Sequence, residues 1–388
     1  MMHSTTLVLQ IIAILGCTSS CAYYVLCLFG ARHFVRSQRN PCDALSVEIP
    51  AVSVLKPLKG TDPEMYESFR SHCLQDHPEY EIVFGVSDPV DPALASIERL
   101  RKEFPDRSIQ LVICPEILGP NVKVSNLEQM AHAARYEYLV VNDSDIRVEP
   151  DYLRRIVPPL ADVKIGMVTC LYRGIAASTL GSRLESLGIS TDFCAGVLAA
   201  RLLEGGLSFG LGSTLAFRRR ELNKVGGFKS IVDFLADDYE LGNRIAGLGQ
   251  KVQLSDVVVE TYLPAYDFGG FLAHQMRWAR GVRDARLGGY VGLASTFGFM
   301  WALLNLLFAG AERWAWIVLG CVLLLRTLVA LVVGKSILKD HQVPRLLWLL
   351  PVRDLLAVAI WIVSFWGHTV KWRGDLFELR KGRLVRIS

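Results

Sequence analysis

The chain has 388 residues, of which 51% are apolar, and its formal net charge of +4 arises from 42 basic and 38 acidic residues. This nearly balanced charge excludes a nucleic-acid-binding protein as the first interpretation. The chain is longer than one small domain and carries more apolar surface than a soluble protein buries, so part of it is expected to lie in a lipid bilayer.

The cysteine pattern indicates a reducing compartment. The nine cysteines form no C-x-x-C pair and have no histidine partner at metal-ligand spacing, and several lie in apolar runs. A disulfide framework and a zinc site are therefore not expected, and the cysteines are interpreted as small buried side chains.

The first predicted element is an uncharged apolar stretch from Leu7 to Phe29, long enough to supply the roughly 20 residues that cross a bilayer core. Arginines at positions 32, 36 and 39 follow it, whereas no lysine or arginine precedes it. A cleaved signal peptide is the alternative, because residues 14–17 loosely resemble a lipoprotein cleavage site, but the charges favour an uncleaved anchor. The positive-inside rule then places the N-terminus outside and the chain from residue 30 onward in the cytosol. We expect an anchor over residues 1–30 and a polar linker over residues 31–50.

The pattern of residues 51–288 is that of an α/β domain. Short β-rich runs recur at Ala51–Leu55, Tyr80–Val86, Ile109–Ile113 and Tyr138–Val141. Helical patterns lie between them at Pro63–Leu74, Pro92–Phe104 and Val124–Ala134. This alternation predicts a Rossmann-like, mostly parallel sheet flanked by helices. No G-x-G-x-x-G turn follows the first run, so a dinucleotide-binding domain is not expected.

The chain turns apolar again over residues 289–367, where segments long enough to span a bilayer lie at Tyr290–Ala309, Trp314–Gly334 and Leu346–Trp366. The last of them contains Arg353 and Asp354, whose charges are unfavourable in lipid unless they are paired or lie at the interface. Crossing with all of these segments would also leave the basic tail, residues 368–388, outside, against the positive-inside rule. One segment is therefore expected to be interfacial or re-entrant, without an indication of which.

The strongest local signal for chemistry is Asp143-Ser144-Asp145, just after the run Tyr138–Val141. Residues i and i+2 of a strand point to one side, so the carboxylates of Asp143 and Asp145 could face one hard cation, Mg²⁺ or Mn²⁺. Such a cation would bind a donor diphosphate and neutralise the leaving group. An isolated Asp-x-Asp is more often a turn or a cap, which is the alternative.

Further carboxylates stand at Asp88, after the run that ends at Val86, and at Asp237-Asp238. The carboxyl ends of parallel strands are where α/β sheets bind ligands, although Asp88 is equally compatible with a turn before Pro89. Asp237 and Asp238 would ordinarily be capping residues at the start of a helix. A sugar acceptor, however, needs a base beside its hydroxyl, and a carboxylate in a partly dry cleft supplies one.

The segment His274–Arg280 offers a planar cation for phosphate and an aromatic face for a sugar or a base, in Arg277 and Trp278. The alternative is a basic amphipathic helix that lies on anionic lipid. Both interpretations rest on its position directly before the apolar residues that begin near 289.

The order Asp88, Asp143-Ser144-Asp145, Asp238 and Arg277-Trp278 resembles the D, DxD, D, (Q/R)xxRW series of family 2-like GT-A glycosyltransferases. More narrowly, residues from about 50 to 290 resemble the ceramide glucosyltransferase family, glycosyltransferase family 21. The segments that carry this narrower resemblance are Val54–Pro63, Val86–Pro92, Asn121–Leu127 and Asp143–Val148. Other segments look closer to the bacterial members associated with hopanoid biosynthesis, namely Thr169–Gly174, Leu235–Tyr239 and His274–Arg280. The closing segment Thr369–Gly374 also resembles the tail of the family.

The resemblance implies an inverting hexosyltransferase that uses a UDP-sugar and a divalent cation. It implies that Asp88 lies near the uracil or ribose and that Asp143 and Asp145 lie at the metal and the diphosphate. It implies that Asp238 is the catalytic base.

Other donor-binding residues also follow from the resemblance. Arg277 and Trp278 would hold the pyrophosphate. Lys56, Lys59 and Lys123 are further candidates for donor binding.

Residues on the acceptor or donor side are expected among Asp237, Gly212 and Ser213, because a glycine permits close approach of the backbone. His274 departs from the family pattern, which more often has Gln or Arg at this position. A histidine at this position can still donate a hydrogen bond, but its charge depends on pH, and the role of His274 stays open.

The expected acceptor is the hydroxyl of a membrane lipid, because Arg277-Trp278 shortly precedes an apolar stretch. The choice between ceramide with glucose and a bacteriohopanepolyol with N-acetylglucosamine stays open. A processive polysaccharide synthase and an inactive membrane scaffold are the remaining alternatives. The resemblance and the charges imply an integral protein of the bacterial inner membrane, with its catalytic domain in the cytosol and no nucleic-acid partner.

Overall fold

The computed structural model describes residues 2–37, 49–372 and 375–387. The chain divides into two compact units. The sheet unit comprises residues 40–177, 204–265 and 375–388, and the helical unit comprises residues 1–39, 178–203 and 266–374. Most of the expected linker, residues 38–48, lies outside the described residues, as do Arg373 and Gly374 of the family-like tail segment.

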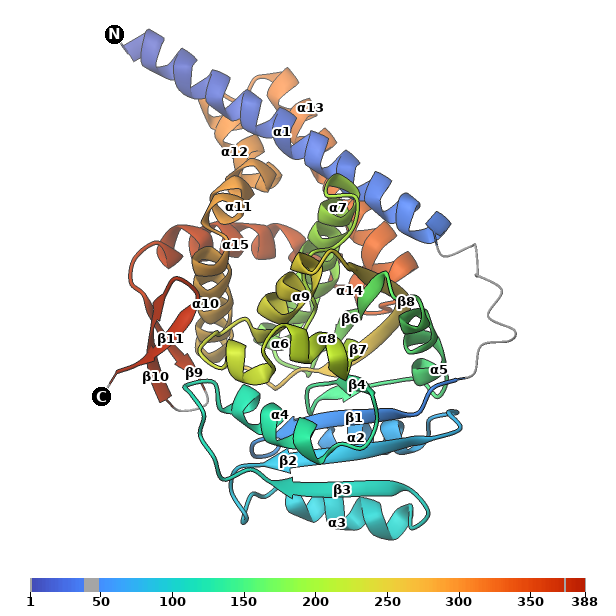
Figure 1. Ribbon diagram of the computed structural model, residues 1–388. Coiled ribbons are helices and arrows are strands. Elements are labelled where there is room, and N and C mark those ends of the chain that lie inside the picture. Colours follow the sequence, from blue (N-terminus) through green and yellow to red (C-terminus); the bar gives the residue numbers. More distant parts are fainter. Residues whose placement is uncertain (1, 38–48, 373–374, 388) are drawn as a thin grey trace. The chain divides into compact units, whose positions relative to one another are not determined.

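An eight-stranded sheet, in the order β3-β2-β1-β4-β7-β6-β8-β5, organises the sheet unit (Figure 1). The strands are β1 Val52–Leu58, β2 Tyr80–Val86, β3 Ser108–Ile113, β4 Tyr138–Val141, β5 Ile146–Arg147, β6 Ile165–Ile175, β7 Leu215–Arg218 and β8 Lys251–Tyr262. Strands β3, β2, β1 and β4 pair in parallel, as do β6 and β8. Strands β7 and β5 run antiparallel to their neighbours. The predicted α/β domain with a mostly parallel sheet is confirmed.

Helices connect these strands and cover the sheet. They are α2 Met65–Cys73, α3 Leu94–Glu103, α4 Val122–Ala133, α5 Tyr152–Ile156, α8 Arg219–Lys224 and α9 Asp237–Gly247, with one-turn helices at Pro158–Ala161 and Phe228–Ile231. Because parallel crossovers are right-handed, α2 and α3 cover one face of strands β1 to β4 and α4 covers the other. All residues of β1 and β2 are buried, which explains their nearly continuous apolar runs.

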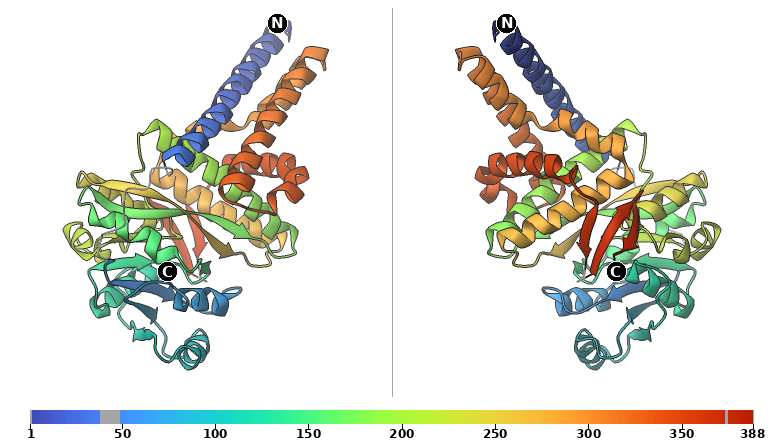
Figure 2. Two further views of the ribbon diagram at one scale, coloured as in Figure 1. Left: turned by 90° about the vertical axis from the view of Figure 1, so that its right-hand side faces the viewer. Right: turned by 90° about the vertical axis from the view of Figure 1, so that its left-hand side faces the viewer.

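The C-terminal residues of the sheet unit form a hairpin of β10 Asp375–Arg380 and β11 Arg383–Arg386, drawn side by side in red in Figure 2. Its turn is Lys381-Gly382, with φ of 51° and 79°. Two successive positive φ values match the tight turn whose twist suits an antiparallel pair, and glycine adopts this conformation without strain. The residues expected only as a basic tail are therefore partly a folded element.

The helical unit is built from helices of very different length. They are α1 Met2–Ser37, α6 Leu180–Gly188, α7 Cys194–Leu203, α10 Phe268–Ala285, α11 Leu287–Gly292, α12 Gly298–Phe308, α13 Arg313–Ala330, α14 Val343–Leu346 and α15 Leu350–Ser364. Further elements are the π-helices Ile189–Phe193 and Leu331–Ile337, the 3-10 turns Leu293–Thr296 and Leu347–Leu349, and β9 Thr369–Trp372. Helix α1 lies beside α12 and α13 in both views of Figure 2.

Four helical stretches of the described chain are long and apolar enough to cross a membrane: Thr5–Ser37, Leu180–Leu203, Arg313–Ile337 and Val343–Ser364. A fifth candidate is the pair Leu287–Thr296 and Gly298–Phe308, which bends by 51°. This bend falls in one of the segments from which a re-entrant or interfacial element was expected. The stretch Leu180–Leu203 was not expected to span, and α1 continues to Ser37 beyond the expected anchor boundary at residue 30.

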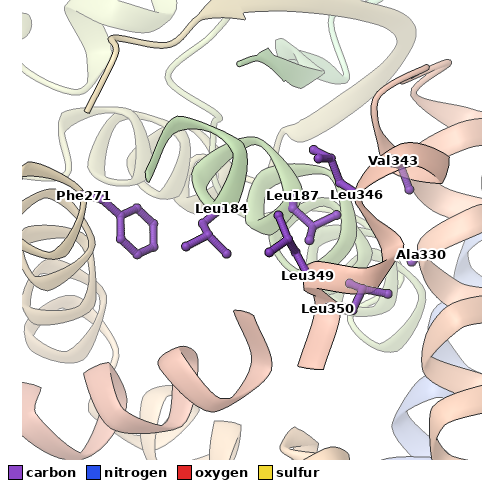
Figure 3. Close-up of a cluster of buried hydrophobic side chains, with 8 residues drawn as sticks. All are labelled: Leu184, Leu187, Phe271, Ala330, Val343, Leu346, Leu349 and Leu350. Atoms are coloured by element: carbon purple, nitrogen blue, oxygen red, sulfur yellow. The ribbon is translucent and has the colours of Figure 1, made fainter. Parts of the chain in front are cut away.

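Figure 3 shows a hydrophobic cluster that joins four parts of the helical unit. Its members are Leu184, Leu187, Phe271, Ala330, Val343, Leu346, Leu349 and Leu350. They come from α6, α10, α13 and the segment that runs from α14 into α15. The stretch Leu180–Leu203, expected as part of a continuous α/β domain over residues 51–288, therefore packs with the C-terminal helices.

The charges of α15 are paired within the helical unit. Arg326 of α13 donates to both carboxylate oxygens of Asp354 at 2.9–3.2 Å and to Asp192 at 2.5 Å. Arg353 lies 3.7 Å from Asp192 and donates to the side-chain oxygen of Gln275 at 3.2 Å. Pairing of this kind is what allows ionised side chains to lie in an apolar helical bundle.

Candidate active site

The carboxyl edge of the parallel strands carries the predicted acidic residues. Leu58 at the end of β1 pairs with Val86 of β2, and Leu55 pairs with Val141 of β4. The segments that follow these strands therefore start at one edge of the sheet. They contain Lys59-Gly60, Asp88 and Asp143-Ser144-Asp145.

The turn that holds Asp143 and Asp145 is fixed from several sides. The amide of Asn142 donates to Tyr152 and to the carbonyl of Ser213, at 2.9 and 2.7 Å. Lys56 is completely buried, and its ammonium donates to the carbonyl of Asp143 at 2.9 Å. This hydrogen bond holds the main chain of the turn at Asp143 in place.

The carboxylate of Asp145 accepts a hydrogen bond of 2.5 Å from the hydroxyl of Thr261 in β8. Burial and, to a smaller extent, the nearby negative charge of Asp143 raise the pKa of Asp145 to about 6. Burial lowers the pKa of Lys56 to about 7, against the opposing effect of Asp145, Asp143 and Asp62. Asp62 also accepts a hydrogen bond from Ser144. Excess negative charge therefore surrounds the turn.

Asp143 and Asp145 fit a divalent cation of the Mg²⁺ type. Within the described residues, no cluster of three or more His, Cys, Asp and Glu side chains is suited to hold an ion. That finding does not conflict with a nucleotide site, because Mg²⁺ there is usually held by one or two carboxylates together with substrate phosphates. A cation beside Asp143 and Asp145 would also offset the repulsion that raises the pKa of Asp145.

Lys123 joins this turn to the second acidic pair. Its ammonium lies 2.9 Å from Oδ1 of Asp143 and 3.1 Å from Oδ2 of Asp237. Burial alone would lower the pKa of Lys123, but the charges of Asp143 and Asp237 outweigh it and raise the pKa. Lys123 stands in the first turn of α4, where Asn121 caps the helix by accepting from the N–H of Val124 at 3.1 Å.

Asp238 lies in the first turn of α9, and its Oδ1 accepts a hydrogen bond of 2.8 Å from the N–H of Tyr239. Burial and, to a smaller extent, the neighbouring charge of Asp237 raise the pKa of Asp238 to about 6. Such a carboxyl is ionised at neutral pH but is more basic than an exposed aspartate, which suits a proton acceptor.

Gly212 shows that the two acidic motifs converge. A Cβ at Gly212 would lie 3.1 Å from Oδ2 of Asp238 and 3.7 Å from Oδ2 of Asp143. The backbone therefore approaches both carboxylates closely because Gly212 has no side chain. The hydroxyl of Ser213 points elsewhere, since it donates to the carbonyl of Cys170 at 3.0 Å.

Asp88 follows β2 and is exposed, and its Oδ1 accepts from the N–H of Val90 at 2.9 Å. This is the turn interaction that the alternative interpretation expected, although it leaves Oδ2 of Asp88 available at the sheet edge. A residue that the sequence reasoning missed is Asp91, whose carboxylate accepts from the N–H of Gly60 at 2.9–3.1 Å. The positive φ of 71° at Gly60 marks a tight loop that needs such a partner.

His274 and Trp278 lie on α10 in the helical unit. Nδ1 of His274 lies 3.3 Å from Glu185, and the next residue, Gln275, donates to the other oxygen of Glu185 at 2.7 Å. The ring of His274 stacks on Tyr266 and contacts Trp278. Glu185 was not anticipated, because its helix was not expected in this unit.

Two other arginines of α10 bind main-chain carbonyls. Arg280 donates to Trp366 and Thr369 at 2.9 and 2.5 Å, and Arg283 donates to Gly367 at 3.1 Å. These contacts do not support the alternative of a basic helix that lies on anionic lipid. Arg277 stands on the same helix, between Gln275 and Trp278.

Comparison with known proteins places the chain in a family. The model of glycosyl transferase family 21 matches residues 12–385. Ceramide glucosyltransferase 3 of Caenorhabditis elegans is 24% identical over 344 residues, which cover 86% of this chain and 74% of that protein. The ceramide glucosyltransferase of Komagataella phaffii is 32% identical over 117 residues, which cover 29% of this chain and 23% of that protein.

A solved structure shares the fold. It is a mannosyltransferase from Pyrobaculum calidifontis in complex with GDP-Man and Mn²⁺, similar with a TM-score of 0.54 and 21% identity over 92% of this chain and 99% of that one. Since the family model spans nearly the whole chain, the protein belongs to glycosyl transferase family 21 and is a glycosyltransferase with a GT-A-type fold.

Proposed function

We propose that this enzyme transfers a hexose from a UDP-sugar to the hydroxyl of a membrane lipid, with inversion at the anomeric carbon. The observation that carries the proposal is the pairing of Lys123 with both Asp143 and Asp237. It joins the carboxylate of the proposed diphosphate site to the residue beside Asp238, whose carboxyl is half-buried. The ceramide glucosyltransferases among its relatives and the apolar helices support a lipid acceptor.

In this proposal, Asp143 and Asp145 hold a divalent cation, Mg²⁺ or Mn²⁺, which would neutralise the diphosphate leaving group. Lys123 adds positive charge beside them, and buried Lys56 orients their turn through the carbonyl of Asp143. Asp88, at the same sheet edge, contacts the uracil or the ribose. The family pattern assigns Arg277 and Trp278 to the donor pyrophosphate.

Asp238 acts as the general base. The lipid oxygen forms a bond to the anomeric carbon while the bond from that carbon to the diphosphate oxygen breaks. The hydroxyl proton passes to Asp238, and the electron pair of the broken bond leaves with UDP. A single displacement of this kind needs no covalent sugar–enzyme intermediate.

Ceramide with glucose is the proposed pair of substrates, because the named relatives are ceramide glucosyltransferases. A bacteriohopanepolyol with N-acetylglucosamine is the second candidate, favoured by the segments Thr169–Gly174 and His274–Arg280. We place the enzyme in a bacterial inner membrane with the sheet unit facing the cytosol, following the arginines that succeed the first apolar stretch.

The test is transfer by the purified full chain in lipid nanodiscs. UDP-glucose and UDP-N-acetylglucosamine are each supplied with ceramide or with a bacteriohopanepolyol, and the products are analysed by mass spectrometry. We expect one glycolipid that carries a single sugar, lost on chelation and restored by Mg²⁺ or Mn²⁺. A high-molecular-weight polymer would favour a processive synthase, and the absence of any transfer would refute the proposal.

A further inference from the structure

We infer that the C-terminal hairpin, β10 and β11, holds the segment Asp233–Leu235 in place and thereby positions Asp238 for catalysis. This inference rests on the proposed role of Asp238 as the base. The hairpin and this segment both belong to the sheet unit, although the apolar helices separate them along the chain.

The main chains of the two segments are bonded in both directions. The N–H of Leu384 donates to the carbonyl of Asp233 at 2.6 Å, and the N–H of Leu235 donates to the carbonyl of Gly382 at 3.2 Å. Phe234 and Arg383 form an antiparallel bridge between these bonds. The hairpin thus adds a short piece of sheet to the segment that leads into α9.

Side chains strengthen this contact. The guanidinium of Arg383 lies 5.2 Å from the ring centre of Phe234, and that of Arg244 lies 5.5 Å from the same centre. Cations at this distance from an aromatic ring are attracted to it. Since Arg244 belongs to α9, Phe234 links the hairpin to the helix that begins with Asp237-Asp238.

The opposite side of the segment is held by the start of α4. The N–H of Asn121 donates to the carbonyl of Val232 at 3.0 Å, and its side-chain amide donates to the carbonyl of Phe234 at 2.8 Å. Asn121 lies two residues before Lys123 in the sequence. The segment before Asp238 is therefore fixed between the helix that carries Lys123 and the C-terminal hairpin. A shift of about 1 Å in a catalytic group is enough to lower a rate about 100-fold.

An alternative role for the hairpin would be to bind anionic lipid through exposed arginines. Its contacts argue against this role, because Arg380 pairs with Glu378 at 2.7 Å and Arg386 pairs with Asp375 at 3.0 Å. Arg383 differs from these two arginines, because it reaches outside the hairpin to Phe234 and to Asp233, at 3.9 Å. Arg383 is therefore the residue to test, and Arg380 is its matched control.

The experiment compares Arg383→Ala, Arg383→Lys, Arg380→Ala and a chain that ends after Trp372. We expect Arg383→Ala to lower kcat about 10-fold and the truncation about 100-fold, while UDP affinity and the melting temperature of Arg383→Ala stay near wild type. Arg383→Lys keeps the cation and should recover part of kcat. Arg380→Ala should match the wild type. A purely structural role of the hairpin would instead lower the melting temperature and kcat together.

Amide hydrogen exchange provides a readout that does not depend on activity. We expect faster exchange at Leu235 and across the start of α9 in Arg383→Ala and unchanged exchange in Arg380→Ala. Unchanged exchange and kcat in both Arg383→Ala and the truncated chain would overturn the inference. If Asp238→Asn still abolished transfer in that case, the proposed function would stand and only the inference about the hairpin would fall. If the wild type transferred no sugar, the proposed function would fail, and the exchange result would still decide whether the hairpin holds the segment.

Discussion

The ammonium of Lys123 lies 2.9 Å from a carboxylate oxygen of Asp143, although the two residues are 20 positions apart in the sequence. The same ammonium lies 3.1 Å from Asp237, so a single lysine neutralises parts of both acidic motifs. Removing it would leave two nearby carboxylates that repel each other and, under the proposed function, also repel the donor diphosphate. Lys123 thus offsets the repulsion between Asp143 and Asp237.

We predict that Lys123→Met lowers transfer at least about 100-fold, because a fixed positive group beside the developing charge is lost. The variant should also lower the melting temperature, since Asp143 and Asp237 lose the cation that they share. Lys123→Arg should retain part of the activity, because it keeps the charge. Lys102→Met changes an exposed lysine of α3 and serves as the control. Transfer rate, UDP affinity and melting temperature are the measurements. Activity of Lys123→Met close to that of the control would contradict the role assigned to this lysine.

A second prediction concerns the base. Asp238→Asn keeps an oxygen that can accept from the N–H of Tyr239 but removes the proton acceptor, so kcat should fall by about 10²–10⁴ with little change in the donor KM. Asp256→Asn, at an exposed carboxylate paired with Arg155, is the control. Near-native turnover of Asp238→Asn, under conditions where chemistry limits the rate, would show that another group takes the proton.

The pH dependence follows from the same carboxyl. Burial, with the charge of Asp237, raises the pKa of Asp238 to about 6, and the base works only when it is deprotonated. Activity should therefore be nearly full at pH 7 and fall towards tenfold for each further pH unit below about 6. The check is kcat between pH 5 and 8 at saturating donor, in a pH range where the melting temperature stays constant. If kcat stayed constant down to pH 5, the rate would not depend on the ionisation of Asp238.

The parallel half of the sheet was predictable because each strand has its own local signal. Continuous apolar runs such as Tyr80–Val86 indicate strands that are covered on both faces, and the alternation with helices indicates that these strands run parallel. In a parallel sheet, the residues that follow the strands lie at the same edge. Local pattern alone thus located Asp88, Asp143 and Asp145 at one edge.

Other features depend on contacts that local pattern does not encode. The helical stretch Leu180–Leu203 contains the charged residues Glu185 and Asp192, so its sequence does not look like a membrane span. Both charges are paired with residues of other helices, and the sequence does not show that pairing. The C-terminal hairpin has short strands rich in arginine, which resemble a solvated tail in sequence. The pairing of Lys123 with Asp237 joins residues 114 positions apart, and no spacing rule predicts such a contact.

Gly212 provides a steric test of the site. A methyl group there would lie 3.1 Å from Oδ2 of Asp238, which is closer than most Cβ contacts, so Asp238 would have to move or lose space beside its oxygen. We expect Gly212→Ala to lower kcat about 10-fold while the fold is retained, given the effect of small displacements on rates. In Gly206→Ala, the added Cβ meets nothing within 4 Å, and this variant should behave like the wild type. If the two variants were equally active, Gly212 would not lie beside the reacting groups.

The last prediction concerns the charges inside the helical unit. Arg326 is 3% exposed and binds both Asp192 and Asp354, so Arg326→Met would leave two carboxylates without their main cation. Losing one member of a buried pair costs about 3–5 kcal/mol, whereas replacing both members by apolar residues is often nearly neutral. We therefore expect Arg326→Met to lower the yield and melting temperature of the detergent-solubilised protein, and the double variant Arg326→Met with Asp354→Leu to recover part of that loss. Arg345→Met, at an exposed arginine of α14, is the control. A double variant less stable than Arg326→Met alone would mean that Asp354 is needed for more than balancing Arg326.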